Sequence, residues 1–361
     1  MSNKDEIAEQ DDTFGKEDVA EPIPPQDIVA YNELRSCADL FRLHSSGKLE
    51  IQPDFQREVV WKQDEQSRFI DSLVKQLPIP SMCFSLDYKT QRWKVIDGLQ
   101  RMTSIIRFLS TAEWQLGDLL DIHPRLRKAK NTDLRRGDVE QQRLFALVED
   151  VSIPVTVIRC DYTQQTHMRY LFTIFHRLNS GGVRLTNQEI RNCIYTGPFN
   201  DLLKRFDKDN KDWRVVKNRV WGSMDRFRSV EVLLRILAFG DSRRLYDGNL
   251  ARFLNDYMYS KASLPVESLS GISDTLSVLV GHTREALRHE PQRKLSLATV
   301  EAVLVALYVH RNREVPYTAD YLHQAYARMK ANVTFTEAAR YAISSMENVS
   351  ARLAAAVSAF E

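Results

Sequence analysis

The chain has few cysteines, and none of them lie close together. Its 361 residues include only four, at Cys37, Cys83, Cys160 and Cys193. Structural zinc sites and the disulfide frameworks of small secreted proteins both need cysteines at short, paired spacings. The pattern therefore excludes both classes and predicts reduced thiols in a cytoplasmic protein.

The sequence also lacks an apolar run long enough for a membrane span. The longest apolar helix candidate, Leu297 to His310, contains Glu301 and is shorter than the roughly 20 residues that cross a bilayer. The amino terminus is acidic and polar, whereas a signal peptide begins basic and continues apolar. We therefore expect no signal peptide and no membrane association.

Charge is distributed unevenly along the chain. Residues 1–30 carry nine acidic and two basic side chains, a net charge of −7, which leaves +9 for the remainder. Residues 1–28 have too few apolar side chains to offset the entropy of ordering, so we expect a disordered acidic tail. Six Lys or Arg gather between Arg125 and Arg136. Such a run is usually a solvated surface, and a basic arm for nucleic-acid backbone is the alternative.

Hydrophobic periodicity divides the rest of the chain in two. After the tail, strand candidates alternate with helical patterns such as "QDEQSRFIDSLVKQL", which places Phe69, Leu73 and Leu77 on one helix face. The strand candidates are "KLEIQP", "SMCFSL", "RWKVID" and "SIPVTVIRC". Beyond Pro198 the stretches become long and amphipathic. The sequence thus predicts an α+β domain over residues 29–198 and an all-helical domain over residues 199–361.

The stretch "WKVIDGLQRMTSIIRFL", residues 93–109, concentrates polar residues where a strand passes into a helix. A helix start attracts anions, because its first N–H groups are unpaired and carry partial positive charge. Gly98 would let a ligand approach closely, and Arg101 would offer a planar fork of donors to phosphate oxygens. Asp97 could hold a divalent metal, orient a water or pair with Arg101, and Gln100 could position a water or a ribose. A purely structural Asp–Arg pair is the alternative.

A second segment, "IQPDFQREVVW" at residues 51–61, repeats this composition. Its apolar residues, Phe55, Val59 and Trp61, have the character of core positions. Gln56 and Arg57 between them form a polar tip. On its own this segment indicates only a strand end that carries two hydrogen-bonding side chains.

A third segment, "FHRLNSGGVRLTNQEIR" at residues 175–191, joins two helices through a Ser-Gly-Gly turn. Thr186 and Glu189 form a capping box for the second helix. Glycines at such a turn most often mark a helix stop. The turn also gathers donors of the kind that form anion-binding nests, at Arg177, Asn179, Ser180 and Gly181.

Taken in this order over residues 31–200, the three motifs closely resemble the GmrSD-type restriction-system N-terminal domain family, whose signature is Asp-Gly-Gln-Gln-Arg. The resemblance implies a ParB/sulfiredoxin-like mixed sheet that presents a glycine and an arginine to nucleotide phosphates. It also implies a nucleotide-binding protein, with NTP hydrolysis as a further capability, in bacterial defence against phage or foreign DNA. The partners implied are a nucleoside triphosphate, DNA and a separate nuclease subunit.

The resemblance assigns roles to particular residues. Arg57 and Arg101 would contact phosphates, and Asp97 would hold Mg²⁺ or a water. The implied catalytic residues are Asp97, Gln100 and Arg101. The implied nucleotide-binding residues are Gln56, Arg57, Gly98, Arg177, Asn179, Ser180 and Gly181. We expect Arg57, Gly98, Arg101 and Asn179 to line one cleft.

Two departures from the family pattern narrow this expectation. Leu99 stands where the signature has glutamine, which puts in question any hydrolysis that needs both amides. None of the eight histidines lies in an HNH-like pattern, and no pair has the i, i+4 spacing of metal ligands. We therefore expect no nuclease module of the chain's own.

Two other functions fit the sequence. A non-catalytic DNA-binding or adaptor module would use residues 125–136 and the segment "DWRVVKNRVWGSMDRFR", although the aromatic residues of the latter suit a helix junction equally well. The other alternative is a nuclease that acts through Asp97. For that function the sequence offers no second carboxylate at metal-site spacing.

Overall fold

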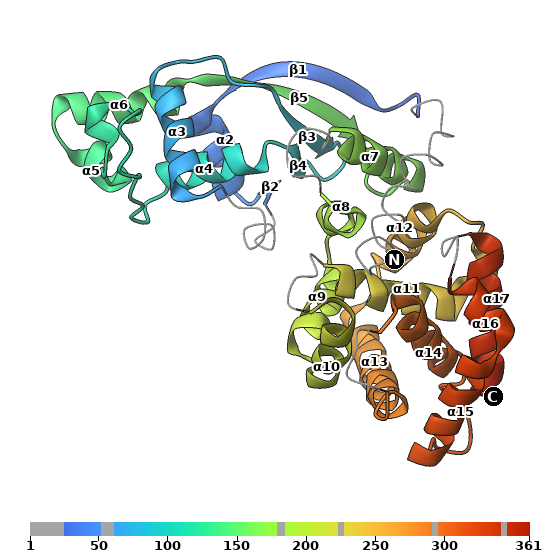
Figure 1. The fold of residues 1–361 in the computed structure, drawn as a ribbon. Helices are drawn as coiled ribbons and strands as arrows, with labels where there is room; N and C mark the ends of the chain where they lie inside the picture. Colours follow the sequence, from blue (N-terminus) through green and yellow to red (C-terminus); the bar gives the residue numbers. More distant parts are fainter. Residues whose placement is uncertain (1–24, 52–60, 179–184, 223–226, 291–294, 341–344) are drawn as a thin grey trace. The chain divides into compact units, whose positions relative to one another are not determined.

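A computed structural model describes residues 25–51, 61–178, 185–222, 227–290, 295–340 and 345–361. The described residues belong to two compact units that divide after residue 184. We call them the α/β unit, described from residue 25, and the helical unit, described from residue 185 (Figure 1). The domain boundaries expected from the sequence pattern stay predictions.

The described residues of the α/β unit form five strands and a set of helices. Its strands are β1 (Val29–Ser36), β2 (Leu49–Glu50), β3 (Met82–Asp87), β4 (Trp93–Asp97) and β5 (Ser152–Cys160). Its helices are α2 (Cys37–Ser45), α3 (Gln63–Val74), α4 (Leu99–Leu109), η3 (Pro124–Leu126), α5 (Asn131–Arg136), α6 (Val139–Asp150) and α7 (Gln165–Leu178). Each of the four strands expected from the sequence has a counterpart here, although β2 is only two residues long.

The five strands form one mixed sheet in the order β1-β5-β3-β4-β2. β5 pairs with β1 antiparallel and with β3 parallel, while β4 pairs with β3 antiparallel and with β2 parallel. The α+β class and the mixed sheet are therefore confirmed. The ParB/sulfiredoxin-like assignment of this sheet stays a prediction.

One face of the sheet carries the main core of the unit. Alternate residues of a strand point to opposite faces, and Met82, Phe84 and Leu86 of β3 point to the same face as Val155 and Val157 of β5. These side chains pack with buried residues of α2, α3, α4 and α6 in a single cluster. We call this the inner face of the sheet.

The opposite, outer face is only partly covered. Ile96 and Ile158 point to it and are buried, and α7 contacts β4. The buried side chains of α7, including Leu171 and Phe172, supply the apolar surface that covers this part. Farther along the same face, towards β1, Leu34 is 71% exposed.

One helix is shorter than its sequence pattern predicts. Phe69 and Leu73 are buried on α3 as expected, but Leu77 is 49% exposed, so its placement on the same helix face was wrong. The helix ends at Val74, and Gln76 has a left-handed backbone with φ of 53°. Proline disfavours helical geometry at the residue before it, and Leu77 precedes Pro78.

The helical unit is built around α14. Its helices are α8 (Asn187–Ile194), α9 (Pro198–Asp209), α10 (Lys211–Trp221), α11 (Arg228–Ser242), η4 (Arg243–Leu245), α12 (Leu250–Lys261), α13 (Val266–Ala286), α14 (Leu297–Val309), α15 (Ala319–Ala331), α16 (Val333–Ala338) and α17 (Met346–Ala359). Every residue from Leu297 to Tyr308 is buried. The helix packs against α11, α13 and α17, which explains why its sequence is apolar on all sides.

Within the described ranges, no helix combines the length and apolar character needed to cross a membrane.

Candidate functional site

A β-bulge sets the direction of the Asp97 side chain. Phe84 of β3 faces Val95 of β4, but the next residue of β3, Cys83, faces Asp97. Ile96 and Asp97 therefore lie together opposite one residue. Such a bulge interrupts strict alternation and re-aims side chains, so Asp97 points to the outer face with Cys83 instead of to the inner face with Val95.

Gly98 begins α4 in a conformation that other residues rarely adopt. Its φ is 94° and its ψ is 17°, in the left-handed region. A Cβ atom at this position would lie only 2.6 Å from Cγ of Met82. No side chain caps the start of the helix. The first-turn N–H groups of α4 are therefore those that a helix offers to water or to an anion.

Arg101 forms the ion pair that the sequence suggested as a structural alternative. Its Nη2 donates to Oδ2 of Asp97 at 2.9 Å. Its Nη1 donates to the carbonyl oxygens of Pro80 and Ser81, the latter at 3.4 Å. The Arg101 side chain is 13% exposed and that of Asp97 is 42% exposed. The guanidinium thus joins the start of α4 to the segment before β3, while its Nε–H has no partner among the described residues.

Gln100 connects the first motif with the second. Its Oε1 accepts a hydrogen bond from the backbone N–H of Trp61 at 3.1 Å. Trp61 ends the second motif, and its ring lies 5.6 Å from that of Phe69 on α3. The sequence predicted that Gln100 hydrogen-bonds a ligand or a water and that Trp61 is a core residue. Nothing in the local sequence signals their contact, because the two residues are 39 positions apart.

Several predicted site residues lie outside the described residues. They are Gln56, Arg57, Asn179, Ser180 and Gly181. The expected convergence of Arg57 and Asn179 on Gly98 and Arg101 stays a prediction. Arg177 is described: it lies in the last turn of α7 and is exposed.

The signature position occupied by Leu99 has an apolar role in this chain. Leu99 is partly buried and packs against the core cluster of the α/β unit. Its side chain therefore contributes to packing where a glutamine would offer hydrogen bonds.

The donor set for a metal ion is small. Among the described residues, no group of three or more His, Cys, Asp or Glu side chains is placed to hold a metal. Mg²⁺ is commonly bound by one or two carboxylates together with substrate phosphates. Asp97 fits that mode, because it is partly exposed and its Oδ1 has no partner in the described part of the chain. Burial, with a smaller effect of Asp97, raises the pKa of the neighbouring Cys83 thiol to about 12, so that thiol is neutral.

Comparison with known families decides which class of domain carries this geometry. Residues 37–196 match the family described as GmrSD restriction endonuclease, N-terminal domain. The match covers 160 of the 361 residues, so this part of the chain is similar to GmrSD N-terminal domains. Comparison with curated proteins gives no match.

The GmrSD N-terminal match extends past the division between the two units. It ends at residue 196, whereas α8 belongs to the helical unit. The predicted capping box is confirmed at this helix: Thr186 Oγ1 accepts from the Glu189 N–H at 3.3 Å, and Glu189 Oε2 accepts from the Thr186 N–H at 2.6 Å. The third motif therefore contributes its final residues to the helical unit.

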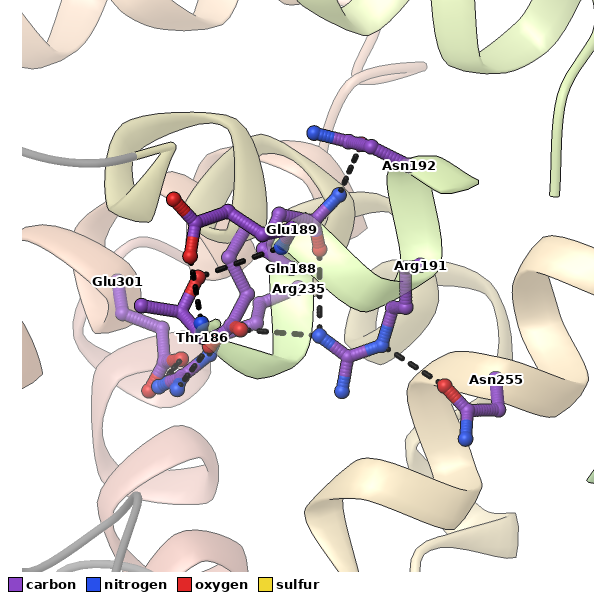
Figure 2. Close-up of polar contacts among 9 residues, drawn as sticks. Thr186, Gln188, Glu189, Arg191, Asn192, Arg235, Asn255 and Glu301 are labelled. Carbon is purple, nitrogen blue, oxygen red and sulfur yellow. Dashed lines mark hydrogen bonds and ion pairs between the residues drawn. The ribbon is translucent and has the colours of Figure 1, made fainter. Parts of the chain in front are cut away.

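Arg191, near the end of the third motif, is fully buried in the helical unit. Its Nε donates to Oδ1 of Asn255 on α12, and its Nη1 donates to Glu231 on α11, both at 2.9 Å. Nη1 of Arg191 also donates to Oε1 of Gln188, and Nε2 of Gln188 donates to Oδ1 of Asn192 (Figure 2). The sequence gave no signal of these contacts, whose partners lie 40 and 64 positions away.

The ion pair of Arg191 continues into a buried chain of alternating charges. Glu231 also accepts from Arg235 at 2.6 Å. Glu301 on α14 lies 3.4 Å from Arg235 and 2.8 Å from Arg352 on α17. Burial opposes the ionisation of Glu231, but Arg235 and Arg191 outweigh it and hold the pKa of its carboxyl below the usual value. These charges connect four helices of the unit that follows the GmrSD N-terminal sheet.

The basic stretch of the GmrSD N-terminal domain is largely paired within the protein. Four of its members form ion pairs with carboxylates: Arg125 with Asp138, Arg127 and Lys128 with Asp118, and Lys130 with Glu113. Arg135 donates to the carbonyl of Leu109 and stacks on Phe145. This arrangement is that of an ordinary solvated surface.

The aromatic residue at the start of the other basic segment is a core residue. Trp213 on α10 has no exposed surface, and its Nε1 donates to Asp207 at 2.7 Å. Lys217 binds the same carboxylate at 2.7 Å. Trp213 is therefore not available for stacking on a base.

Proposed function

We propose that the chain binds a nucleoside triphosphate at the Asp97–Arg101 turn and serves a restriction-like defence system. The observation that carries this proposal is the start of α4. An uncapped helix N-terminus opens with a left-handed glycine, between a carboxylate that a bulge turns outward and an arginine in the first turn. Backbone N–H groups, a guanidinium and a carboxylate are the groups that bind a phosphate and its metal ion.

Each residue of the turn has a distinct part in this proposal. The N–H groups of the first turn of α4 bind phosphate oxygens, and Arg101 donates its remaining N–H groups to the same oxygens. Asp97 holds Mg²⁺, whose charge neutralises phosphate. The ion pair with Arg101 fixes the Asp97 carboxylate. Gln100 accepts a hydrogen bond from Trp61 and so holds the last residue of the second motif beside the turn.

Hydrolysis of the nucleotide is part of the proposal. Phosphoryl transfer depends chiefly on positioning and on charge neutralisation and needs no covalent nucleophile from the protein. DNA cleavage is assigned to a separate nuclease subunit, because the chain carries no HNH-like histidine pattern.

Arg101→Ala is expected to weaken nucleotide binding by about 1.5 to 3 kcal/mol, roughly ten- to 150-fold in Kd, because charge-assisted hydrogen bonds to phosphate are lost. The measurement is calorimetric titration of the purified chain with each NTP and Mg²⁺. Arg107→Ala is the matched control, since Arg107 lies on the same helix and donates to Gln66 at 3.0 Å. Unchanged affinity in Arg101→Ala, with a lower melting temperature, would assign Arg101 to structure alone.

A further inference from the structure

A row of neutral hydrogen-bonding side chains crosses the uncovered part of the outer face. Thr156 of β5 donates through Oγ1 to Oδ1 of Asn32 on β1 at 2.9 Å. The Oγ of Ser81, just before β3, lies 3.2 Å from the same Oγ1. We call these three residues the hydroxyl ladder. Ser81 and Asn32 are exposed and Thr156 is half-buried.

The hydroxyl ladder lies on the same face of the sheet as the Asp97–Arg101 turn. Strand register places Asn32 opposite Thr156, Thr156 opposite Cys83, and Cys83 opposite Asp97. The bulge turns Asp97 to the face on which Thr156 lies. At the other end, Arg101 donates to the carbonyl oxygen of Ser81 itself. The register therefore places the charged turn and the ladder on the same face of the sheet, with the buried Cys83 between them.

This face changes in chemistry along its length. At the turn it offers a carboxylate and a guanidinium. On the ladder it offers hydroxyl groups and the Asn32 amide, whose Nδ2 has no partner among the described residues. Neutral groups that both donate and accept are suited to sugar hydroxyls, whereas phosphates and metal ions select charged groups. Two strand spacings of about 4.8 Å place Thr156 about 10 Å from Asp97, which is comparable with the length of a triphosphate chain.

Resting on the proposed nucleotide function, we propose that the hydroxyl ladder binds the ribose hydroxyls of a nucleotide whose phosphates lie at the Asp97–Arg101 turn. The ladder then selects ribonucleotides over deoxyribonucleotides. The 2′-hydroxyl is both a donor and an acceptor, and it is the group by which proteins distinguish the two sugars. The exposed Nδ2 of Asn32 and the hydroxyl of Ser81 would bond the two sugar oxygens, with Thr156 orienting both residues.

The test compares each of ATP, GTP, CTP and UTP with its 2′-deoxy counterpart, titrated with Mg²⁺ into the full chain. The wild type is expected to bind the ribonucleotide about three- to tenfold more tightly, the usual scale of one hydrogen bond. Thr156→Val and Asn32→Ala should reduce that ratio to near one, chiefly by weakening ribonucleotide binding. Thr156→Ser, which keeps the hydroxyl, should retain the preference.

The outcomes separate this proposal from the one on which it rests. Nucleotide binding that needs Arg101 but shows equal affinity for both sugars overturns the ladder and leaves the nucleotide site in place. A sugar preference that persists in both Thr156→Val and Asn32→Ala also overturns it. If no nucleotide binds the wild type, both proposals fail. Valine favours strand geometry, and circular dichroism of each variant confirms that the sheet is intact.

Discussion

Glu301→Gln is expected to lower the free energy of unfolding of the helical unit by about 3 to 5 kcal/mol, the scale for breaking a buried ion pair on one side. Glu301 is 1% exposed and lies between the guanidinium groups of Arg235 and Arg352. Glutamine keeps the size of the side chain but removes its charge. Two buried cations would then face a neutral amide, one of whose ends is itself a donor.

The measurement is urea unfolding followed by far-UV circular dichroism. Glu337→Gln in the same unit is the control, because Glu337 is exposed and forms no described ion pair. Its effect should stay within about 0.5 kcal/mol. Equal stability of Glu301→Gln and Glu337→Gln would show that the buried charges are hydrated in solution and that the network does not hold α14 against α17.

Gly98→Ala is expected to destabilise the α/β unit by about 2 to 4 kcal/mol, because two independent effects add. A left-handed backbone is unfavourable for alanine, and the new Cβ would collide with the Met82 side chain. Gly47→Ala separates the two effects within the same unit. Gly47 also has positive φ, at 70°, but a Cβ there would meet no atom within 4 Å.

The comparison of Gly98 with Gly47 is made by thermal and urea unfolding. Gly47→Ala should cost only the backbone component, about 1 to 2 kcal/mol. Adding Met82→Ala to Gly98→Ala should recover the steric component, so that the double variant is more stable than the sum of the two single changes predicts. If Gly98→Ala lowered the free energy of unfolding no more than Gly47→Ala does, the close approach of α4 to β3 would not constrain the turn.

Much of the α/β unit was predictable because short segments of its sequence carry the hydrophobic patterns of strands and helices. The strands at residues 82–87, 93–97 and 152–160 are rich in apolar residues, and the turn at Gly98 has a helix-start composition. The strand β1 was not predicted. It lies at the sheet edge, and its exposed residues, such as Val29 and Leu34, give no apolar alternation. Its pairing with β5 joins segments more than a hundred residues apart.

The candidate site was predictable in its composition but not in its arrangement. The residue types at Asp97, Gly98 and Arg101 suggested an Asp–Arg pair, and the structure contains it. The bulge that redirects Asp97 depends on the register between β4 and β3. The contact of Gln100 with Trp61 depends on how the fold brings together two segments that are distant in the sequence. Strand register and contacts between distant segments are tertiary properties that no short window of sequence encodes.

The burial of α8 in the helical unit determines where the protein can be cut to produce its N-terminal half. A chain that ends at residue 196 contains the whole family match but none of the partners that α8 contacts on α11 and α12. It would expose the apolar side chains of Ile190 and Ile194 together with an unpaired Arg191. Exposed apolar surface of this kind promotes aggregation. The soluble fragment is therefore expected to end before α8, even though the family match continues through it.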